Sequence, residues 1–437
     1  MKALFNSRRH QYLARISILL IMVTLIAGIG GCLPAAEYTL SISSTLGGTV
    51  AYPGIGTFIY PEGGVVLLMA DPDEGYSFTH WSGHVSTVAN VNAATTTITM
   101  YGHYFITANF VYGQLIRTWY DLDAIRNNLT CTYTLMNDLS STTPGYEQLA
   151  SPTANGGKGW QPIGNWSVTF NGTFNSQGHE ISDMFVNRPD ESPVGLFAAV
   201  DVAGVIQNVK VMNANVTGDL AVGGLIGWNE GTVSNSYATG RVTGGCSTGG
   251  LVGYNVYGTV SNSYSTADVA GSTNVGGLIG VISDGTVSKS YATGNVSGDS
   301  GVGGLIGYNG GTVSNSYTTG NVTGDLVVGG LIGGSWGNVT CSYSAGNVTG
   351  NNLTGGLIGD KWGGIISHSF WDTETSGHNI SAGGAGKNTT EMQDIVTFSG
   401  ALWNIVAVTN PSLRNLSYIW NMVNNVTYPF LSWQPVS

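Results

Sequence analysis

A repeat of 26 or 27 residues is the feature that most limits how this 437-residue chain can fold. Each unit begins Gly-Gly-Leu, and the leucines recur in register between residues 223 and 370, at Leu225, Leu251, Leu278, Leu305, Leu331 and Leu357. A fixed period of this length is typical of stacked units that cannot bury an apolar face alone. Glycine-rich turns divide each unit into three short runs rich in Val, Ile, Thr and Tyr, too short for helices. The repeat predicts coils of a parallel β-helix.

The same period predicts which side chains meet between coils. Coils stack at about 4.8 Å, so equal repeat positions lie above one another. Columns of leucine and valine then fill a continuous interior, and a one-residue insertion is tolerated only in a turn. An asparagine column that is interrupted by Lys289, Cys341 and His368 is interpreted as an incomplete amide ladder, formed by Asn208, Asn235, Asn262 and Asn315.

The repeat also carries a family resemblance. Gly-Gly-Leu-Ile-Gly, followed by Gly-Thr-Val-Ser-Asn-Ser-Tyr-Ala-Thr-Gly, resembles the GLUG repeat of microbial surface proteins. That repeat occurs in adhesins and beside the catalytic domain of some surface peptidases. The resemblance implies an all-β, capped, right-handed parallel β-helix and a surface location rather than a particular reaction. We expect this solenoid over residues 194–370.

Residues 33–112 are expected to form a separate small module. Four β-rich runs are separated by turns such as Asp71–Gly75. The order Ala-Asp-Pro-Asp-Glu-Gly-Tyr-Ser-Phe-Thr-His-Trp-Ser-Gly, closed by Thr-Ala-Asn-Phe, resembles the divergent B-repeat of internalin-type surface proteins. The resemblance implies a β-grasp-like spacer or binding unit, with Phe78 and Trp81 in its core. We interpret His80 and His84 as turn residues, because a zinc site needs further ligands.

Residues 1–32 are interpreted as a targeting segment. A basic start precedes an apolar run of 14 residues, Ile16 to Ile29, which is short for a membrane-spanning helix. The run ends in Ile-Gly-Gly-Cys, which resembles the lipobox of lipoprotein signal peptides and implies lipidation of Cys32. An ordinary signal peptide or an uncleaved anchor remains the alternative. The predicted location is extracytoplasmic, at the cell surface, with membrane attachment through the lipid alone.

Caps are expected at both ends of the solenoid. Residues 113–193 are interpreted as an N-terminal cap with irregular first coils, including a helix over 118–128 that begins with a capping box at Thr118. Residues 371–437 are interpreted as a C-terminal cap. Asn388 and Glu391 predict a helix through about residue 396, and the aromatic residues from Trp403 to Trp433 are expected to seal the last coil.

We recognise no catalytic, cofactor-binding or metal-binding motif in the sequence, so we predict no catalysis, cofactor or metal site. His179-Glu180 lacks the second histidine of a zinc peptidase motif, and the first strand of each coil has no acid. The acids that recur after Thr-Gly or Ser-Gly are interpreted as turn residues, with weak calcium binding as the alternative (Asp219, Asp299, Asp325). The net charge of −11 argues against nucleic acid as a partner.

The three cysteines beyond Cys32 show no disulfide pattern, because they are far apart and odd in number: Cys131, Cys246 and Cys341. Cys341 occupies a position of the asparagine column, where we expect a small buried thiol. No metal-ligand spacing links the three residues.

An aromatic column is the candidate binding site. Trp228, Tyr254 and Tyr308 directly follow the glycine-rich motif, Val281 interrupts them, and Trp336 and Trp362 follow slightly later in the last two repeats. If Leu225 points inward, alternation directs Ile226 and Trp228 outward, forming a strip suited to a sugar chain or an apolar surface. Alternatively, the strand bends at Gly227 and the rings pack in the core or against a turn.

These observations predict a non-catalytic surface protein for adhesion or ligand display. The expected partner is a glycan or a ligand on a host or neighbouring cell. Two alternatives remain open. One is a carbohydrate hydrolase or lyase on a β-helix, which would need convergent acids in a cleft. The other is a structural spacer without a ligand.

Overall fold

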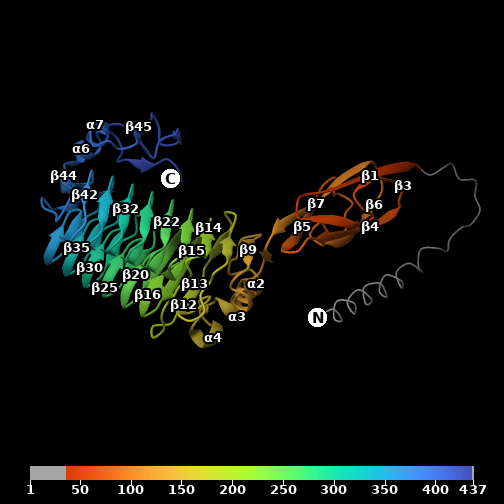
Figure 1. Ribbon diagram of the computed structural model, residues 1–437, viewed down its shortest axis with the longest axis horizontal. Helices are drawn as coiled ribbons and strands as arrows, with labels where there is room; N and C mark the ends of the chain where they lie inside the picture. The colour runs from red at the N-terminus through yellow and green to blue at the C-terminus, as the bar shows by residue number, and fades with distance from the viewer. Residues whose placement is uncertain (1–35, 436–437) are drawn as a thin grey trace, which may run out of the picture. The chain divides into compact units, whose positions relative to one another are not determined.

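The computed structural model describes residues 36–435, which form two compact units (Figure 1). The first unit comprises the described residues up to Asp73 together with Phe78–Phe110, and the second comprises Glu74–Ser77 and the chain from Val111. Residues 1–32, for which the sequence predicts a targeting segment and lipidation of Cys32, lie outside the described residues. Within the described residues, no helix has the length and apolar character needed to cross a membrane.

The first unit consists of two small sheets. One has the order β3-β1-β7-β5 and the other β2-β4-β6. Their strands are β1 (Glu37–Ser44), β2 (Gly48–Tyr52), β3 (Gly56–Pro61), β4 (Val65–Pro72), β5 (Tyr76–Gly83), β6 (Thr95–Thr99) and β7 (Tyr104–Tyr112). Trp81 and Phe78 are buried in the core, as expected. His80, in contrast, is an exposed residue within strand β5 rather than in a turn.

The second unit is a parallel β-solenoid of about seven coils of about 27 residues. The leucine of each repeat is fully buried, and the coils pair in register, for example Val260 with Val287. Each regular coil contributes strands to four sheets rather than to the three runs expected. The extra corner lies at Gly224, where an added Cβ would come within 2.6 Å of the Gly250 carbonyl oxygen. A residue with a side chain cannot make this bend without displacing the next coil.

The strands of the four solenoid sheets are as follows. A ten-stranded sheet contains β8 (Gln114–Ile116), β9 (Thr132–Leu135), β10 (Thr173–Asn175), β14 (Val205–Gln207), β18 (Thr232–Ser234), β22 (Thr259–Ser261), β27 (Thr286–Ser288), β32 (Thr312–Ser314), β37 (Asn338–Thr340) and β42 (Ile366–Ser367). A seven-stranded sheet contains β13 (Phe197–Val200), β17 (Ile226–Asn229), β21 (Val252–Asn255), β26 (Ile279–Ile282), β31 (Ile306–Asn309), β36 (Ile332–Ser335) and β41 (Ile358–Lys361). A six-stranded sheet contains β16 (Leu220–Gly223), β20 (Cys246–Gly249), β25 (Thr273–Gly276), β30 (Ser300–Gly303), β35 (Leu326–Gly329) and β40 (Asn352–Gly355). The fourteen-stranded sheet contains β11 (Glu180–Ser182), β12 (Phe185–Asn187), β15 (Lys210–Thr217), β19 (Tyr237–Thr243), β23 (Tyr264–Ser265), β24 (Asp268–Ala270), β28 (Tyr291–Ala292), β29 (Val296–Ser297), β33 (Tyr317–Thr318), β34 (Val322–Thr323), β38 (Tyr343–Ser344), β39 (Val348–Thr349), β43 (Phe370–Asp372) and β44 (Ala385–Lys387).

The asparagine column does not form the expected amide ladder. Its members have φ between 47° and 60° and lie at a bend between two sheets, as do Lys289, Cys341 and His368. Asparagine is favoured there because it tolerates the left-handed region better than most residues. Asn208 Nδ2 donates to Asn175 Oδ1 at 2.9 Å, but Asn175 pairs with Gln207 in the register and so lies outside the column. At this bend Cys341 is only partly buried, contrary to expectation.

Polar ladders nevertheless run through the interior at other positions. A fully buried serine recurs in the repeat, and the backbone N–H of Ser236 donates to Ser263 Oγ at 3.1 Å. Each of these serines, such as Ser263, also donates its hydroxyl to a carbonyl two residues earlier. A second ladder places Asn229 Nδ2 2.7 Å from Asn255 Oδ1. Buried polar groups satisfied in this way fix the register between coils.

The N-terminal end carries the expected cap. Helix α2 (Trp119–Asp123) begins at Thr118 with a full capping box and continues as the 3₁₀ helix η1 (Ala124–Asn127). Trp119, Leu122 and Ile125 are fully buried within the solenoid core. Two further short helices, α3 (Tyr146–Leu149) and α4 (Ala154–Gly157), belong to the irregular first coils. The predicted cap is therefore present, in two shorter pieces.

The C-terminal segment differs from the expectation. Residues 371–387 close the last coil, with Trp371 buried in the core and β44 paired to β43. The following residues instead lie along the stacked aromatic column that runs from Tyr264 to Phe370. Helix α5 (Thr373–Ser376) lies within residues 371–387, and the later elements are α6 (Thr389–Met392), α7 (Ile395–Ser399), β45 (Ile405–Ala407), β46 (Trp420–Met422) and β47 (Phe430–Leu431). The Asn388 capping box is confirmed, but the helix ends at Met392 because Asp394 caps a second one.

Candidate functional site

The aromatic column occupies one repeat position of the seven-stranded sheet. Trp228 pairs with Tyr254, Tyr254 with Val281 and Val281 with Tyr308 in the parallel register. The next two positions of this column are Gly334 and Asp360. We call the surface formed by the rings of this column and its neighbouring turns the aromatic strip, which consists of Trp166, Trp228, Tyr254, Tyr308, Trp336 and Trp362.

The inward–outward alternation of side chains that the sequence predicts after Leu225 is wrong at Ile226. Leu225 and Ile226 are both fully buried, because strand β17 begins at Ile226 and Leu225 lies in the preceding corner. The pairing register then skips Gly227, where the strand is irregular. The bend anticipated at Gly227 is therefore present, but Trp228 remains partly exposed outside the core rather than within it.

The first aromatic patch comprises Trp166, Trp228 and Tyr254. Trp228 and Tyr254 stack with ring centroids 4.7 Å apart and 26° between planes, and Trp166 meets Trp228 edge-on at 4.8 Å. Stacked rings direct their faces at one another, so Trp228 and Tyr254 present mainly edges to solvent. Trp166 is 46% exposed and comes from an irregular early coil. Because that coil has no repeat register, Trp166 could not be recognised as part of the column from its spacing.

The second aromatic patch comprises Tyr308, Trp336 and Trp362. Trp336 is 55% exposed and Trp362 is 42% exposed, with ring centroids 6.4 Å apart. The ring of Trp362 also lies 6.0 Å from that of Tyr308. Tyr308, Trp336 and Trp362, which the sequence analysis named as candidate ligand contacts, therefore lie together in one patch. Their rings are tilted relative to one another, which leaves aromatic surface open to a ligand.

Two glycines make room for the second patch. A Cβ on Gly334 would lie 2.5 Å from the ring of Trp362, and one on Gly363 would lie 2.8 Å from the ring of Trp336. Gly334 occupies the position held by Tyr308 in the preceding coil. The ring of Trp362 therefore folds back over the place that an aromatic side chain fills elsewhere in the column.

Polar groups border both patches. Glu230 accepts a hydrogen bond from the indole N–H of Trp228 at 3.0 Å, which fixes that ring. Asp284 is exposed in the turn beside Val281, and Asp360 and Lys361 precede Trp362. Burial, followed by the nearby Tyr254, raises the pKa of Tyr308, so its hydroxyl stays protonated and can donate a hydrogen bond. The strip thus combines apolar surface with hydrogen-bonding groups.

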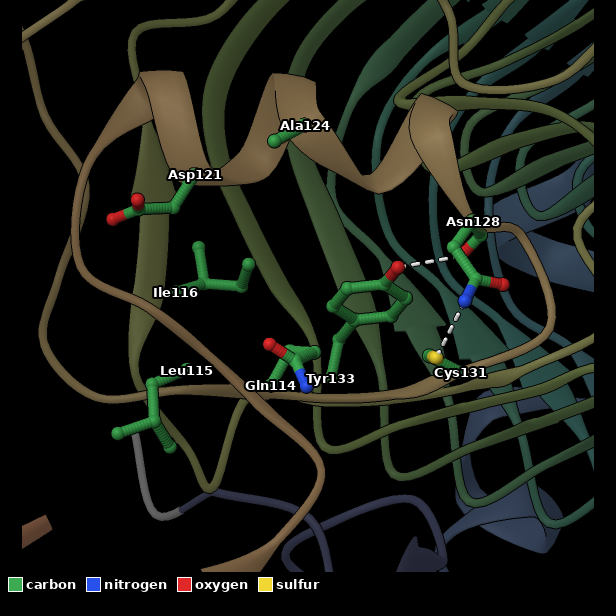
Figure 2. Close-up of a pocket in the computed structure, with 8 residues that line it drawn as sticks. All are labelled: Gln114, Leu115, Ile116, Asp121, Ala124, Asn128, Cys131 and Tyr133. Atoms are coloured by element: carbon green, nitrogen blue, oxygen red, sulfur yellow. Dashed lines mark hydrogen bonds between the residues drawn. The ribbon is translucent and has the colours of Figure 1, made fainter. Parts of the chain in front are cut away.

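A cavity of about 330 Å³ lies at the first coil beneath the cap helix, next to Tyr133 (Figure 2). The Tyr133 hydroxyl donates to the Asn128 carbonyl oxygen, and the Asn128 amide donates to Cys131 Sγ at 2.9 Å. Burial, with a smaller effect of Cys131, raises the pKa of Tyr133 to about 12. Since these polar groups already satisfy one another, the cavity offers less for recognition than the aromatic strip does.

Two acid–base pairs of the early coils, Asp138 with His179 and Glu180 with Lys210, lie on the surface of the described part of the chain. Asp138 binds the ring of His179 at 3.1 Å, and Lys210 lies 3.6 Å from Glu180, all on the surface. The hydrogen bond from the Glu180 backbone N–H, assisted by His179, lowers the pKa of Asp138. Across residues 36–435, no three His, Cys, Asp or Glu side chains are grouped to hold a metal ion.

Comparison with protein-family models matches residues 38–114 to the divergent InlB B-repeat domain and residues 218–243 and 244–270 to the GLUG motif. The chain carries an InlB B-repeat domain and GLUG motifs. The GLUG matches coincide with the coils that hold Trp228 and Tyr254, so two of the three rings of the first aromatic patch lie on GLUG repeats.

Two relatives resemble part of the chain. Halomucin of Haloquadratum walsbyi is 38% identical over 126 residues, which is 28% of this chain and 1% of halomucin. A protein of Evansella cellulosilytica, provisionally named a Gly-rich membrane protein, is 34% identical over 126 residues, 28% of this chain and 14% of that protein. The GLUG-containing chain thus spans a small part of each relative.

Two solved structures show a distant likeness. One is a chain from Bacteroides ovatus, provisionally described as an immunoglobulin A1 protease, with 17% identity and a TM-score of 0.44 over 74% of this chain and 93% of that chain. The other is an IgA1 protease with 12% identity and a TM-score of 0.32, over 78% of this chain and 29% of that chain. Neither likeness supports the transfer of an activity.

Proposed function

We propose that this protein is a non-catalytic cell-surface protein that binds a glycan through the aromatic strip. The observation that carries the proposal is the second patch, where Trp336 and Trp362 are half-exposed on a rigid stack of paired coils. Large apolar rings in this position lose contact with water when a ligand covers them. They need no rearrangement of the backbone, which keeps the cost of binding low.

The proposed location rests on the domains. The InlB B-repeat and GLUG motifs resemble those of microbial surface proteins, and the two relatives are named halomucin and a Gly-rich membrane protein. The B-repeat domain precedes the solenoid in the chain, as a spacer between a membrane anchor and a binding domain would. The anchor in this proposal is a lipid on Cys32.

Changing Cys32 to serine tests the anchor. We expect the variant to lose its acyl group and to remain as an unprocessed precursor, because the thiol is the atom that receives the lipid. Detergent partitioning and the mass of the protein would be compared with those of the parent. Equal partitioning and equal processed mass would show that the chain is not anchored through Cys32.

A glycan array probed with the purified mature protein tests the binding function. We expect the protein to bind a restricted set of the arrayed glycans. The same glycans should remain uncut after prolonged incubation with the protein. Shortened products would instead support a carbohydrate-active enzyme. Retention of no glycan at all would leave the spacer role or an apolar protein partner as the better explanation.

A further inference from the structure

The aromatic strip contains two patches rather than one, and they are aligned along the axis of the solenoid. The column position that holds Trp228 in the first patch holds Tyr308 in the second, three coils later. With about 4.8 Å per coil, these two positions are about 14 Å apart. Between the two patches stands Val281, which is buried and raises no large side chain above the sheet. One extended ligand can therefore reach both patches.

The charges along the strip restrict the kind of ligand. Glu230 and Asp284 follow the column position in their coils and Asp360 occupies it, whereas the cation Lys361 lies next to Asp360 in strand β41. These carboxylates would repel an acidic polymer, and the protein as a whole has a net charge of −11. They can, however, accept hydrogen bonds from the hydroxyl groups of an uncharged sugar chain. The aromatic rings provide apolar contact on the same path.

We propose that the ligand is a neutral, linear polysaccharide that lies along the solenoid axis and contacts both aromatic patches at once. This inference rests on the proposed glycan-binding function and adds the class of glycan, its direction and its minimum span. When one chain occupies two linked sites, the second contact is intramolecular and increases the affinity without new chemistry. A disaccharide is too short to cover both patches in full, because the column from Trp228 to Asp360 spans five coils.

The test compares the affinities for a neutral polysaccharide and for the disaccharide of the same linkage, using a glucan and a chitin series as probes. We expect the parent protein to bind the long chain at least about tenfold more tightly than the disaccharide. Trp166→Ala in the first patch and Trp336→Ala in the second should each weaken binding of the long chain by about tenfold. Both residues are half-exposed, so both variants should fold.

Tyr101→Ala is the matched control, because Tyr101 is 62% exposed and belongs to the first unit. It should leave both affinities unchanged. The inference is overturned if the disaccharide and the long chain bind equally, if either tryptophan variant binds the long chain like the parent, or if polygalacturonate binds better than the neutral probes. Binding of no glycan from any of these series would contradict the proposed function itself.

Discussion

Leu278→Asp should abolish cooperative folding of the solenoid. Leu278 is fully buried in the third regular coil, with the equivalent leucines of the neighbouring coils above and below it. A carboxylate at this position would be removed from water without a partner, which costs at least several kcal/mol even when it is relieved by protonation. Since each coil is stabilised by its neighbours, the damage should spread along the stack. Thermal unfolding followed by circular dichroism would measure it.

Ser297→Asp is the control for this change. Ser297 is exposed in β29, so the same carboxylate stays in water. We expect its midpoint of unfolding to remain close to that of the parent. A Leu278→Asp protein that is soluble and unfolds cooperatively at the parent temperature would contradict the interior described for the coils.

Trp420→Ala should release the C-terminal segment from the tyrosine column. Trp420 is fully buried, its ring lies 6.0 Å from those of Tyr317 and Tyr343, and its indole N–H donates to Asn315 Oδ1. Removing a buried tryptophan side chain costs about 3–5 kcal/mol. Limited proteolysis should then cleave this segment earlier than in the parent, and the midpoint of unfolding should fall.

Trp362→Ala is the matched control, since this tryptophan is 42% exposed and packs over Gly334 at the surface. Its effect on stability should be much smaller. If Trp420→Ala is no more sensitive to protease than Trp362→Ala, the segment does not depend on the tyrosine column for its position.

The solenoid could be predicted from the sequence because each of the six repeats carries the same pattern. Six leucines in one register leave a single way to bury them, and local capping residues such as Thr118 and Asn388 act through neighbouring backbone groups. The asparagine column was misread because periodicity shows that residues are stacked but not which φ they adopt. Likewise, the corner at Gly224 changed the inward or outward direction inferred for Ile226.

The candidate site was only partly accessible to sequence reasoning. Register placed Trp228, Tyr254 and Tyr308 in one column, and the structure keeps that column. Ring orientation depends on contacts between coils, so the stacking of Trp228 on Tyr254 could not be foreseen. The position of the C-terminal segment depends on long-range packing against Tyr264–Phe370, for which a single sequence holds no periodic signal.

Retention on arrayed neutral polysaccharides, measured for the parent and for the Trp336→Ala/Trp362→Ala variant, decides whether the second aromatic patch binds a glycan. The two rings are surface residues that provide the open aromatic area of the second patch. We expect the parent to be retained and the variant to lose at least about tenfold in affinity, with little change in its midpoint of unfolding. A folded variant that is retained as well as the parent would contradict glycan binding through the second aromatic patch.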